Sequence, residues 1–286
     1  MFSTFHQTYN AFEQAGIENP LEETLTLLNI LTNGDLRQMV DAALQGEQFN
    51  LAQILEKRQQ GMPWEYILGQ TRFMGLTLSC SQAALIPRQE TELLVKTVLK
   101  AVADLNQDTV MLIDMGTGSG NIAVSVAFHA PQVRVLASDV SEEAVVLARQ
   151  NAARYDLPDR VSFFCGDLFT PLQNLGYEGA VDIVVCNPPY IPTTSLDNLA
   201  PEIIDYEPVV ALDAGPYGIN IYRRLVSDAL LFLKPGGLLA FEIGAGQEKI
   251  AERLLQKTGG YGTISFVRDE NGVIRVITAV SRPQLP

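Results

Sequence analysis

The sequence predicts an α/β protein with a mostly parallel sheet, preceded by a smaller helical region. From Thr109 onwards, short apolar runs alternate with amphipathic segments, which is typical of a parallel sheet covered by helices on both faces. Up to Gln60, apolar residues recur at helical spacing instead. A chain of 286 residues is long enough for one large and one small domain, each with its own core.

The amino-terminal part is expected to comprise two units. Residues 1–62 have three leucine-rich runs at helical spacing, Leu21–Leu31, Leu36–Leu44 and Leu51–Leu55, and predict a small helical bundle. Residues 63–86 predict a β-hairpin linker, with strand-like pieces at Tyr66–Leu68 and Phe73–Leu78 around a turn at Gly69–Arg72. The remaining residues, 87–286, then form the large domain.

Strands and helices are expected to alternate through the large domain. The predicted strands are Val110–Asp114, Arg134–Asp139, Val161–Phe164, Val181–Cys186 and Leu238–Ile243, with a closing hairpin of Ile264–Arg268 and Val273–Val280. The predicted helices are Gln89–Val102, Gly120–Phe128, Ser141–Tyr155, Ile219–Leu233 and Ala245–Lys257. Ser141 is the expected N-cap of its helix, and Lys234–Gly237 is expected to end the helix before it.

Composition narrows the function classes. A net charge of −13 disfavours a surface that neutralises phosphates, although a local basic groove stays possible. The three cysteines lack CxxC spacing and predict reduced, buried thiols, and two histidines argue against a metal site. The amino terminus has no secretion signal and no apolar run is long enough to cross a membrane, so we expect a cytoplasmic protein.

A glycine-rich turn follows the first strand of the large domain. The segment Asp114-Met115-Gly116-Thr117-Gly118-Ser119-Gly120 lets the backbone approach a ligand closely, and the helix that follows offers free N–H groups. Asp139 ends the next strand, where an acid in a doubly wound sheet receives ribose hydroxyls. The pattern favours an adenosine-containing cofactor over a tight connection without a ligand.

The segment Asn187-Pro188-Pro189-Tyr190 follows the apolar strand Val181–Cys186. Prolines have no N–H and hold their neighbours extended, so the segment offers stiff carbonyls and one side-chain amide. The Asn187 side-chain oxygen and the Pro188 carbonyl are suited to accept the two N–H bonds of a planar NH2 group, and Tyr190 is suited to pack on its plane. The alternative is a simple Pro-Pro turn after a core strand.

Together these motifs resemble the class I methyltransferases that use S-adenosylmethionine. The glycine spacing is GxGxG and differs from the GxGxxG of dinucleotide-binding proteins. In that class, a (D/N)PP(Y/F/W) segment marks enzymes that methylate a planar nitrogen. The resemblance also implies that Asp167 lies near the adenine amino group and Leu168 beside the adenine ring. It implies a seven-stranded, mostly parallel sheet.

Further segments narrow the resemblance to one family, the HemK-type release factor glutamine methyltransferases. The matching segments are Pro63–Gly69, Phe73–Leu76, Leu85–Glu92, Asp114–Gly120, Asp139, Asn187–Tyr190, Glu207-Pro208, Ala211–Asp213, Tyr222–Leu225, Glu242–Gly244 and Gln247. The resemblance implies methyl transfer from S-adenosylmethionine to the side-chain amide of the glutamine in the GGQ motif of class-1 peptide chain release factors. It implies that Gly116–Gly120, Asp139, Asp167, Leu168 and Asn187 bind the cofactor, and that Asn187–Tyr190 bind substrate and carry catalysis. From its position in the chain, the helical domain is expected to dock the protein substrate, and we expect the enzyme to be a monomer.

The chain departs from the family pattern at four positions, Gln89, Met74, Ala214 and Leu168, and these departures bear on affinity more than on reaction type. Three alternative functions stay open from the residues alone. They are an N-methyltransferase of DNA or RNA, an NAD-dependent oxidoreductase, and a binding module without activity. Two side chains have open roles: Cys186 is expected to be a buried strand residue because no histidine is near it in sequence, and Glu207 either braces its loop or lines the substrate channel.

Overall fold

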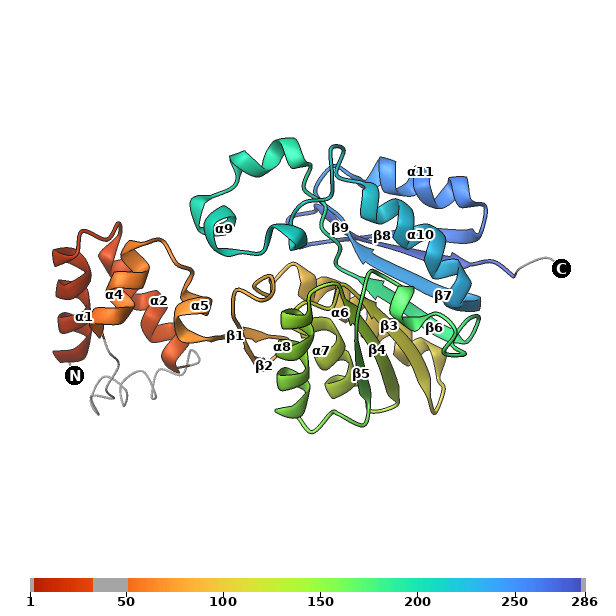
Figure 1. The fold of residues 1–286 in the computed structure, drawn as a ribbon, viewed down its shortest axis with the longest axis horizontal. Helices are drawn as coiled ribbons and strands as arrows, with labels where there is room; N and C mark the ends of the chain where they lie inside the picture. The colour runs from red at the N-terminus through yellow and green to blue at the C-terminus, as the bar shows by residue number, and fades with distance from the viewer. Residues whose placement is uncertain (1–2, 33–50, 284–286) are drawn as a thin grey trace.

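The computed structural model describes residues 3–32 and 51–283, and Figure 1 shows their arrangement. The first elements are helices α1 (Ser3–Gln14), α2 (Pro20–Thr32) and α4 (Leu51–Gln59). Phe12, Leu27, Ile54 and Trp64 form a small core between them. The helical prediction is therefore confirmed for these elements, and the predicted run Leu36–Leu44 lies outside the described residues.

The linker differs from the prediction. Tyr66–Leu68 belongs to a short helix, α5 (Trp64–Leu68), which ends at Gly69 in the left-handed conformation. The hairpin strands are β1 (Gln70–Phe73) and β2 (Leu76–Ser79), so the predicted turn at Gly69–Arg72 is wrong. The turn is Met74-Gly75, where both residues have positive φ (49° and 78°), as a two-residue hairpin requires. A short apolar run is compatible with either a helix or a strand, which explains why Tyr66–Leu68 was predicted as a strand.

The large sheet has seven strands in the order β5-β4-β3-β6-β7-β9-β8. They are β3 (Val110–Met115), β4 (Val133–Asp139), β5 (Val161–Cys165), β6 (Val181–Cys186), β7 (Leu233–Glu242), β8 (Tyr261–Arg268) and β9 (Ile274–Ser281). Neighbouring strands from β5 to β7 are parallel, and β9 is antiparallel to both β7 and β8. The mostly parallel seven-stranded sheet is confirmed, and the carboxyl ends of its five parallel strands share one edge.

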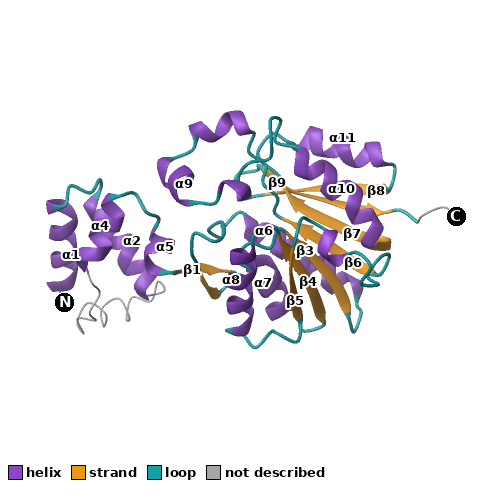
Figure 2. Ribbon diagram, viewed as in Figure 1, coloured by secondary structure: helices purple, strands orange, loops and turns teal. Residues whose placement is uncertain are grey.

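Helices cover both faces of this sheet (Figure 2). Alternate residues of β3 belong to different cores: Leu112 packs with α6 (Thr91–Leu105) and α7 (Asn121–His129), whereas Ile113 packs with α10 (Asn220–Phe232) and α11 (Glu248–Thr258). Helix α8 (Glu142–Ala153) begins as predicted, because the Ser141 hydroxyl accepts a hydrogen bond from the Ala144 N–H at 3.1 Å.

Beyond β6, one region is not as predicted and another had no predicted elements. Strand β7 begins at Leu233, five residues early, and so includes Lys234–Gly237. Its register jumps from Leu233 opposite Val181 to Leu238 opposite Ile183, so a bulge absorbs the extra residues. Between β6 and α10 the chain forms two 3-10 turns, η2 (Thr193–Asn198) and η3 (Val209–Ala211), around helix α9 (Pro201–Tyr206). In the described part of the chain, no helix is long and apolar enough to cross a membrane.

Candidate active site

A pocket lies at the edge where the parallel strands end. The glycine loop follows β3, Asp139 ends β4, Gly166–Leu168 follow β5, and Asn187 follows β6. The strand register sets Met115 beside both Ser138 and Cys186, so these segments are adjacent. All of these segments line the pocket, although Gly120 at the end of the glycine loop does not. Ala83–Arg88 from the loop before α6 line it too, as do Pro208, Val210 and Ala211 near η3.

The glycine loop turns sharply before α7. Gly116, Gly118 and Gly120 all have positive φ (66°, 55° and 79°), which side chains rarely adopt. At Gly120 a Cβ atom would also lie 3.0 Å from the Ala148 Cβ, so glycine lets α7 approach α8. The loop therefore presents backbone to the pocket, as the glycine spacing predicts.

Asp139 fixes this loop from the neighbouring strand. One carboxylate oxygen accepts the Gly118 N–H at 2.8 Å and the other accepts the Ser141 N–H at 2.9 Å. Burial raises the pKa of Asp139 above its ordinary value, and these backbone N–H groups oppose the rise. Each oxygen keeps a second lone pair, so the carboxylate can still accept hydroxyl groups of a ligand.

The pocket has the mixed character that S-adenosylmethionine requires. Its wall includes the apolar side chains of Ala84, Leu85, Ile86 and Leu168, which suit an adenine ring, and its floor is the glycine loop. The Ser119 hydroxyl is buried and has no hydrogen-bond partner within the described residues. It is available to a polar group of a ligand, since buried hydroxyls are almost always paired. The residues present thus fit the cofactor.

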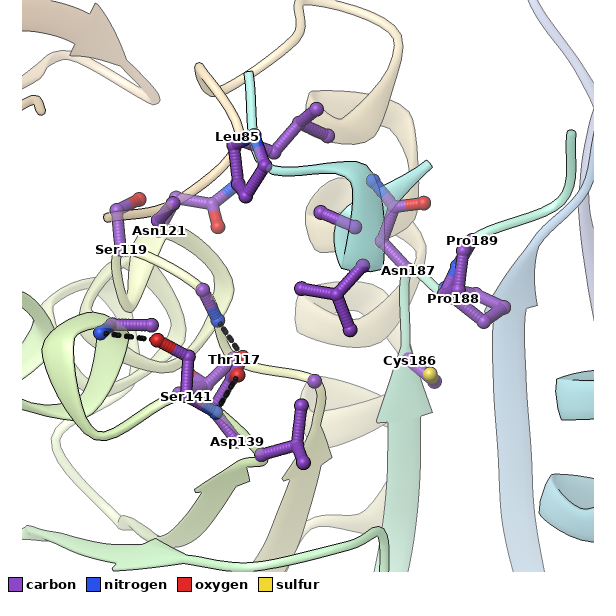
Figure 3. A pocket seen from close by; sticks show the side chains of 18 of the residues that line it. Leu85, Thr117, Ser119, Asn121, Asp139, Ser141, Cys186, Asn187, Pro188 and Pro189 are labelled. Carbon is purple, nitrogen blue, oxygen red and sulfur yellow. Dashed lines mark hydrogen bonds between the residues drawn. The ribbon is translucent and has the colours of Figure 1, made fainter. Parts of the chain in front are cut away.

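Asn187, Pro188 and Pro189 lie across the pocket from Asp139 (Figure 3), whereas Tyr190, the last residue of the predicted segment, does not line the pocket. The Asn187 Nδ2 donates to the Thr91 Oγ1 at 3.0 Å, and within the described residues neither the Asn187 Oδ1 nor the Pro188 carbonyl accepts a hydrogen bond. The Tyr190 carbonyl accepts from the Gln247 Nε2 at 2.9 Å. Two oxygen acceptors therefore stay open in a braced segment.

A buried carboxyl group lies behind this segment. Glu242 ends β7, is 2% exposed, and accepts from the Thr91 Oγ1 at 2.7 Å and from the Tyr190 hydroxyl at 3.5 Å. Burial raises the pKa of Glu242 to about 7. Sequence reasoning did not predict the contact between Thr91 and Glu242, because it spans 151 positions of the chain.

The structure also shows the contacts and positions of three other residues that the sequence analysis singled out. Glu207 forms an ion pair with Arg88 and accepts from the Ile86 N–H at 3.3 Å, so it braces the loop that lines the pocket. Asp167 is exposed and pairs with Arg224 at 2.7 Å, and Leu168 beside it has a positive φ of 46°. Asp167 and Leu168 both line the pocket.

The cysteines are only partly as predicted. Cys80 and Cys186 are buried, but Cys165 at the end of β5 is exposed, which corrects the prediction that all three are buried. Burial raises the pKa of the Cys186 thiol well above its ordinary value, so it is a poor nucleophile. Within the described residues, no cluster of His, Cys, Asp and Glu is placed to hold a metal ion.

A family model and two solved structures match this chain. Residues 88–210 match the family model described as "Methyltransferase small domain". The catalytic domain of human METTL16, solved with a MAT2A 3′UTR hairpin, has the same fold (TM-score 0.58, 16% identity, covering 74% of this chain and 79% of that one). Its N-terminal domain was also solved with SAH (TM-score 0.52, 16% identity, covering 72% and 76%). The fold is that of class I methyltransferases.

Relatives with similar sequences identify a family within this fold class. A protein of Moorella thermoacetica named "Release factor glutamine methyltransferase" is 40% identical over 81% of this chain and 80% of its own length. A protein of Caulobacter vibrioides with the same name is 36% identical over 95% of this chain and 93% of its own length. The chain therefore belongs to the family of release factor glutamine methyltransferases.

Proposed function

We propose that the protein transfers a methyl group from S-adenosylmethionine to the side-chain amide nitrogen of the glutamine in the GGQ motif of class-1 peptide chain release factors, and so modulates translation termination. The observation that carries this proposal is the open pair of acceptors, Asn187 Oδ1 and the Pro188 carbonyl, in a chain 36% identical to a named family member over almost its whole length. A planar NH2 group fits such a pair.

The cofactor side is proposed to comprise Gly116–Gly120, Asp139, Asp167, Leu168 and Asn187. S-adenosylmethionine supplies an electrophilic methyl group on its sulfonium sulfur. Backbone of the glycine loop would approach the amino-acid part, Asp139 would accept from the ribose hydroxyls, and Leu168 would pack on the adenine. The exposed Asp167 would accept from the adenine amino group, beside its partner Arg224.

The substrate side is proposed to be Asn187–Tyr190. The Asn187 Oδ1 and the Pro188 carbonyl would accept the two N–H bonds of the glutamine amide and turn its lone pair toward the methyl group. A C–N bond forms as the C–S bond breaks, and the extra proton leaves the nitrogen to water afterwards. Nothing in this sequence of steps requires a general base. Tyr190 would pack against the amide plane.

The division of the chain is also a proposal. We assign docking of the release factor to residues 1–62, the linker to 63–86 and catalysis to 87–286. Two contacts between α4 and the region of α9 support a role for the first domain near the pocket. Arg58 pairs with Glu202 at 2.6 Å, and the Tyr206 hydroxyl donates to the Gln60 carbonyl at 2.6 Å. We further propose that the enzyme acts as a monomer in the cytoplasm, where translation terminates.

The test is methyl transfer from labelled S-adenosylmethionine to a purified class-1 release factor. We expect label in the release factor that survives nuclease and is lost with protease, and one methyl group on the GGQ glutamine by mass spectrometry. Label that is lost with nuclease would instead identify the protein as a nucleic-acid N-methyltransferase and overturn the proposal.

A further inference from the structure

We propose that Thr91 and Glu242 are positioning residues that fix which way the Asn187 amide faces. This inference rests on the proposed role of Asn187 as an acceptor for the substrate amide. Three segments meet at this point: Thr91 is the first residue of α6, Glu242 is the last of β7, and Asn187 follows β6. Their side chains form one hydrogen-bonded row from Asn187 through Thr91 to Glu242.

The protons available in this row determine which group donates and which accepts in each hydrogen bond. A threonine hydroxyl has one proton to donate, and an ionised carboxylate has none. When Glu242 is ionised, the Thr91 proton therefore goes to the Glu242 Oε2, at 2.7 Å, and the Thr91 oxygen can only accept. The group of Asn187 that faces Thr91, at 3.0 Å, must then be its NH2.

This direction determines what Asn187 offers to a substrate. An asparagine amide can flip, and its two orientations present either a donor or an acceptor. With the NH2 held by Thr91, the Asn187 Oδ1 is left as an acceptor, which is what the N–H of a glutamine amide needs. A flipped Asn187 would place its own NH2 group against the NH2 group of the substrate glutamine, so no hydrogen bond could form there. The pair thus converts an ambiguous side chain into a defined acceptor.

The hydrogen-bonded row is buried, so water cannot readily take the place of a side-chain hydroxyl that is removed. Thr91 is 0% exposed and Glu242 is 2% exposed, so a lost hydroxyl would leave both neighbours with unpaired polar atoms. If Glu242 is protonated, it can donate to Thr91, and the Thr91 proton is then free to point at Asn187. The carboxyl pKa of about 7 places that change within a measurable range.

Several charged or titratable groups act on Glu242. Glu90, the residue before Thr91, raises the pKa of Glu242, and Arg275 of β9 lowers the pKa of Glu242. The Tyr190 hydroxyl donates to the other carboxylate oxygen at 3.5 Å. Tyr222 of α10 and Cys186 of β6 are also near enough to interact electrostatically, and burial keeps both neutral at physiological pH.

The experiment compares four variants of the full chain with saturating S-adenosylmethionine and purified release factor. Thr91→Val removes the hydroxyl at nearly constant shape, Thr91→Ser keeps it, and Glu242→Gln removes the ionised acceptor. Thr97→Val is the matched control, since Thr97 lies on the same helix and its hydroxyl donates to the Leu93 carbonyl of its own helix.

The inference predicts a specific pattern. Thr91→Val should lower kcat about 30-fold, while the Kd for S-adenosylmethionine stays within about 2-fold of wild type. Thr91→Ser and Thr97→Val should stay within about 3-fold of the wild-type kcat. The wild-type kcat should fall as the pH drops through about 7, and Glu242→Gln should lose this dependence.

Two results would overturn the inference: a kcat of Thr91→Val equal to that of Thr97→Val, or the same pH profile in Glu242→Gln as in wild type. If Thr91→Val does not fold, the pH profile of Glu242→Gln compared with that of wild type decides. Asn187→Ala separates the two proposals. If it is inactive while Thr91→Val is normal, only the positioning role fails, and if it is fully active, the proposed role of Asn187 fails.

Discussion

The two sides of the pocket obtain their hydrogen bonds in different ways. On the cofactor side, defined as Asp114 and Gly116–Gly120 with Asp139, carboxylates accept mainly from backbone N–H groups: Asp139 from Gly118 and Ser141, and Asp114 from Ala123 at 3.1 Å. Asp114 also accepts from the hydroxyl of Thr117, three residues away, at 2.7 Å. On the amide side, defined as Asn187–Tyr190 with Thr91, Glu242 and Gln247, the partners are side chains from distant parts of the chain.

This difference has a consequence for function. Backbone N–H groups hold a loop in shape, and a loop of the right shape sets how tightly a cofactor binds. Side-chain rows set the orientation of one reacting group, on which the rate of transfer depends. We therefore expect substitutions on the cofactor side to change affinity and substitutions on the amide side to change the rate. The following predictions test that separation, from the largest effect to the smallest.

Asn187→Ala is expected to have the largest effect. It removes one of the two acceptors for the substrate amide, so kcat should fall by about 1000-fold, comparable to the loss of a key oriented group in other enzymes. Because Asn187 is also proposed to contact the cofactor, the Kd for S-adenosylmethionine, measured by calorimetry, should rise, but by less than about 10-fold, far less than the fall in kcat. Asn198→Ala, at an exposed asparagine of η2, is the control. A kcat within 10-fold of wild type would contradict the role of Asn187.

Asp139→Ala should act mainly on affinity. The Gly118 and Ser141 N–H groups lose their acceptor and the cofactor hydroxyls lose theirs, so the Kd for S-adenosylmethionine should rise about 50-fold. At saturating cofactor the transfer rate should recover to within about 5-fold of wild type. The exposed Asp159 gives the control variant Asp159→Ala. Unchanged affinity would show that Asp139 does not serve the cofactor.

Gln247→Met should have an intermediate effect on rate. The Gln247 Oε1 accepts from the Tyr222 hydroxyl at 2.8 Å and from the Gly244 N–H at 3.0 Å, while its NH2 holds the Tyr190 carbonyl. Loss of this brace should lower kcat about 10-fold with little change in cofactor affinity. Gln256→Met, at a glutamine in the last turn of α11 whose side-chain NH2 donates to Glu252 one turn earlier, should behave as wild type. A change in affinity without a change in rate would contradict the separation.

The smallest effect concerns stability and pH. Burial raises the pKa values of Asp114 and Glu242 to about 7, above their values in an unfolded chain. The folded state therefore binds protons more tightly, so its stability is greatest at low pH and falls as the pH rises through about 7. Urea unfolding should give a free energy about 1–2 kcal/mol higher at pH 6 than at pH 8. The double variant Asp114→Asn, Glu242→Gln should lose most of this difference, and an unchanged difference would exclude these two groups as its source.

The same contrast explains what the sequence can predict. Strands β3 to β6 and the glycine loop follow from local patterns, because buried parallel strands are apolar runs and a sharp turn needs glycine. The Asn187–Tyr190 segment is also visible locally. Its partners are not: Thr91 meets Asn187 across 96 positions, and only the sheet order brings α6 next to the end of β7. The α5 helix and the early start of β7 were missed because short runs carry little periodicity.

One measurement tests the separation of the two sides most directly. It is the single-turnover rate of methyl transfer to the release factor at saturating S-adenosylmethionine, compared among wild type, Asp139→Ala and Asn187→Ala. We predict that the Asp139→Ala rate approaches that of wild type, whereas the Asn187→Ala rate stays about 1000-fold lower. Equal rates for the two variants would contradict the account.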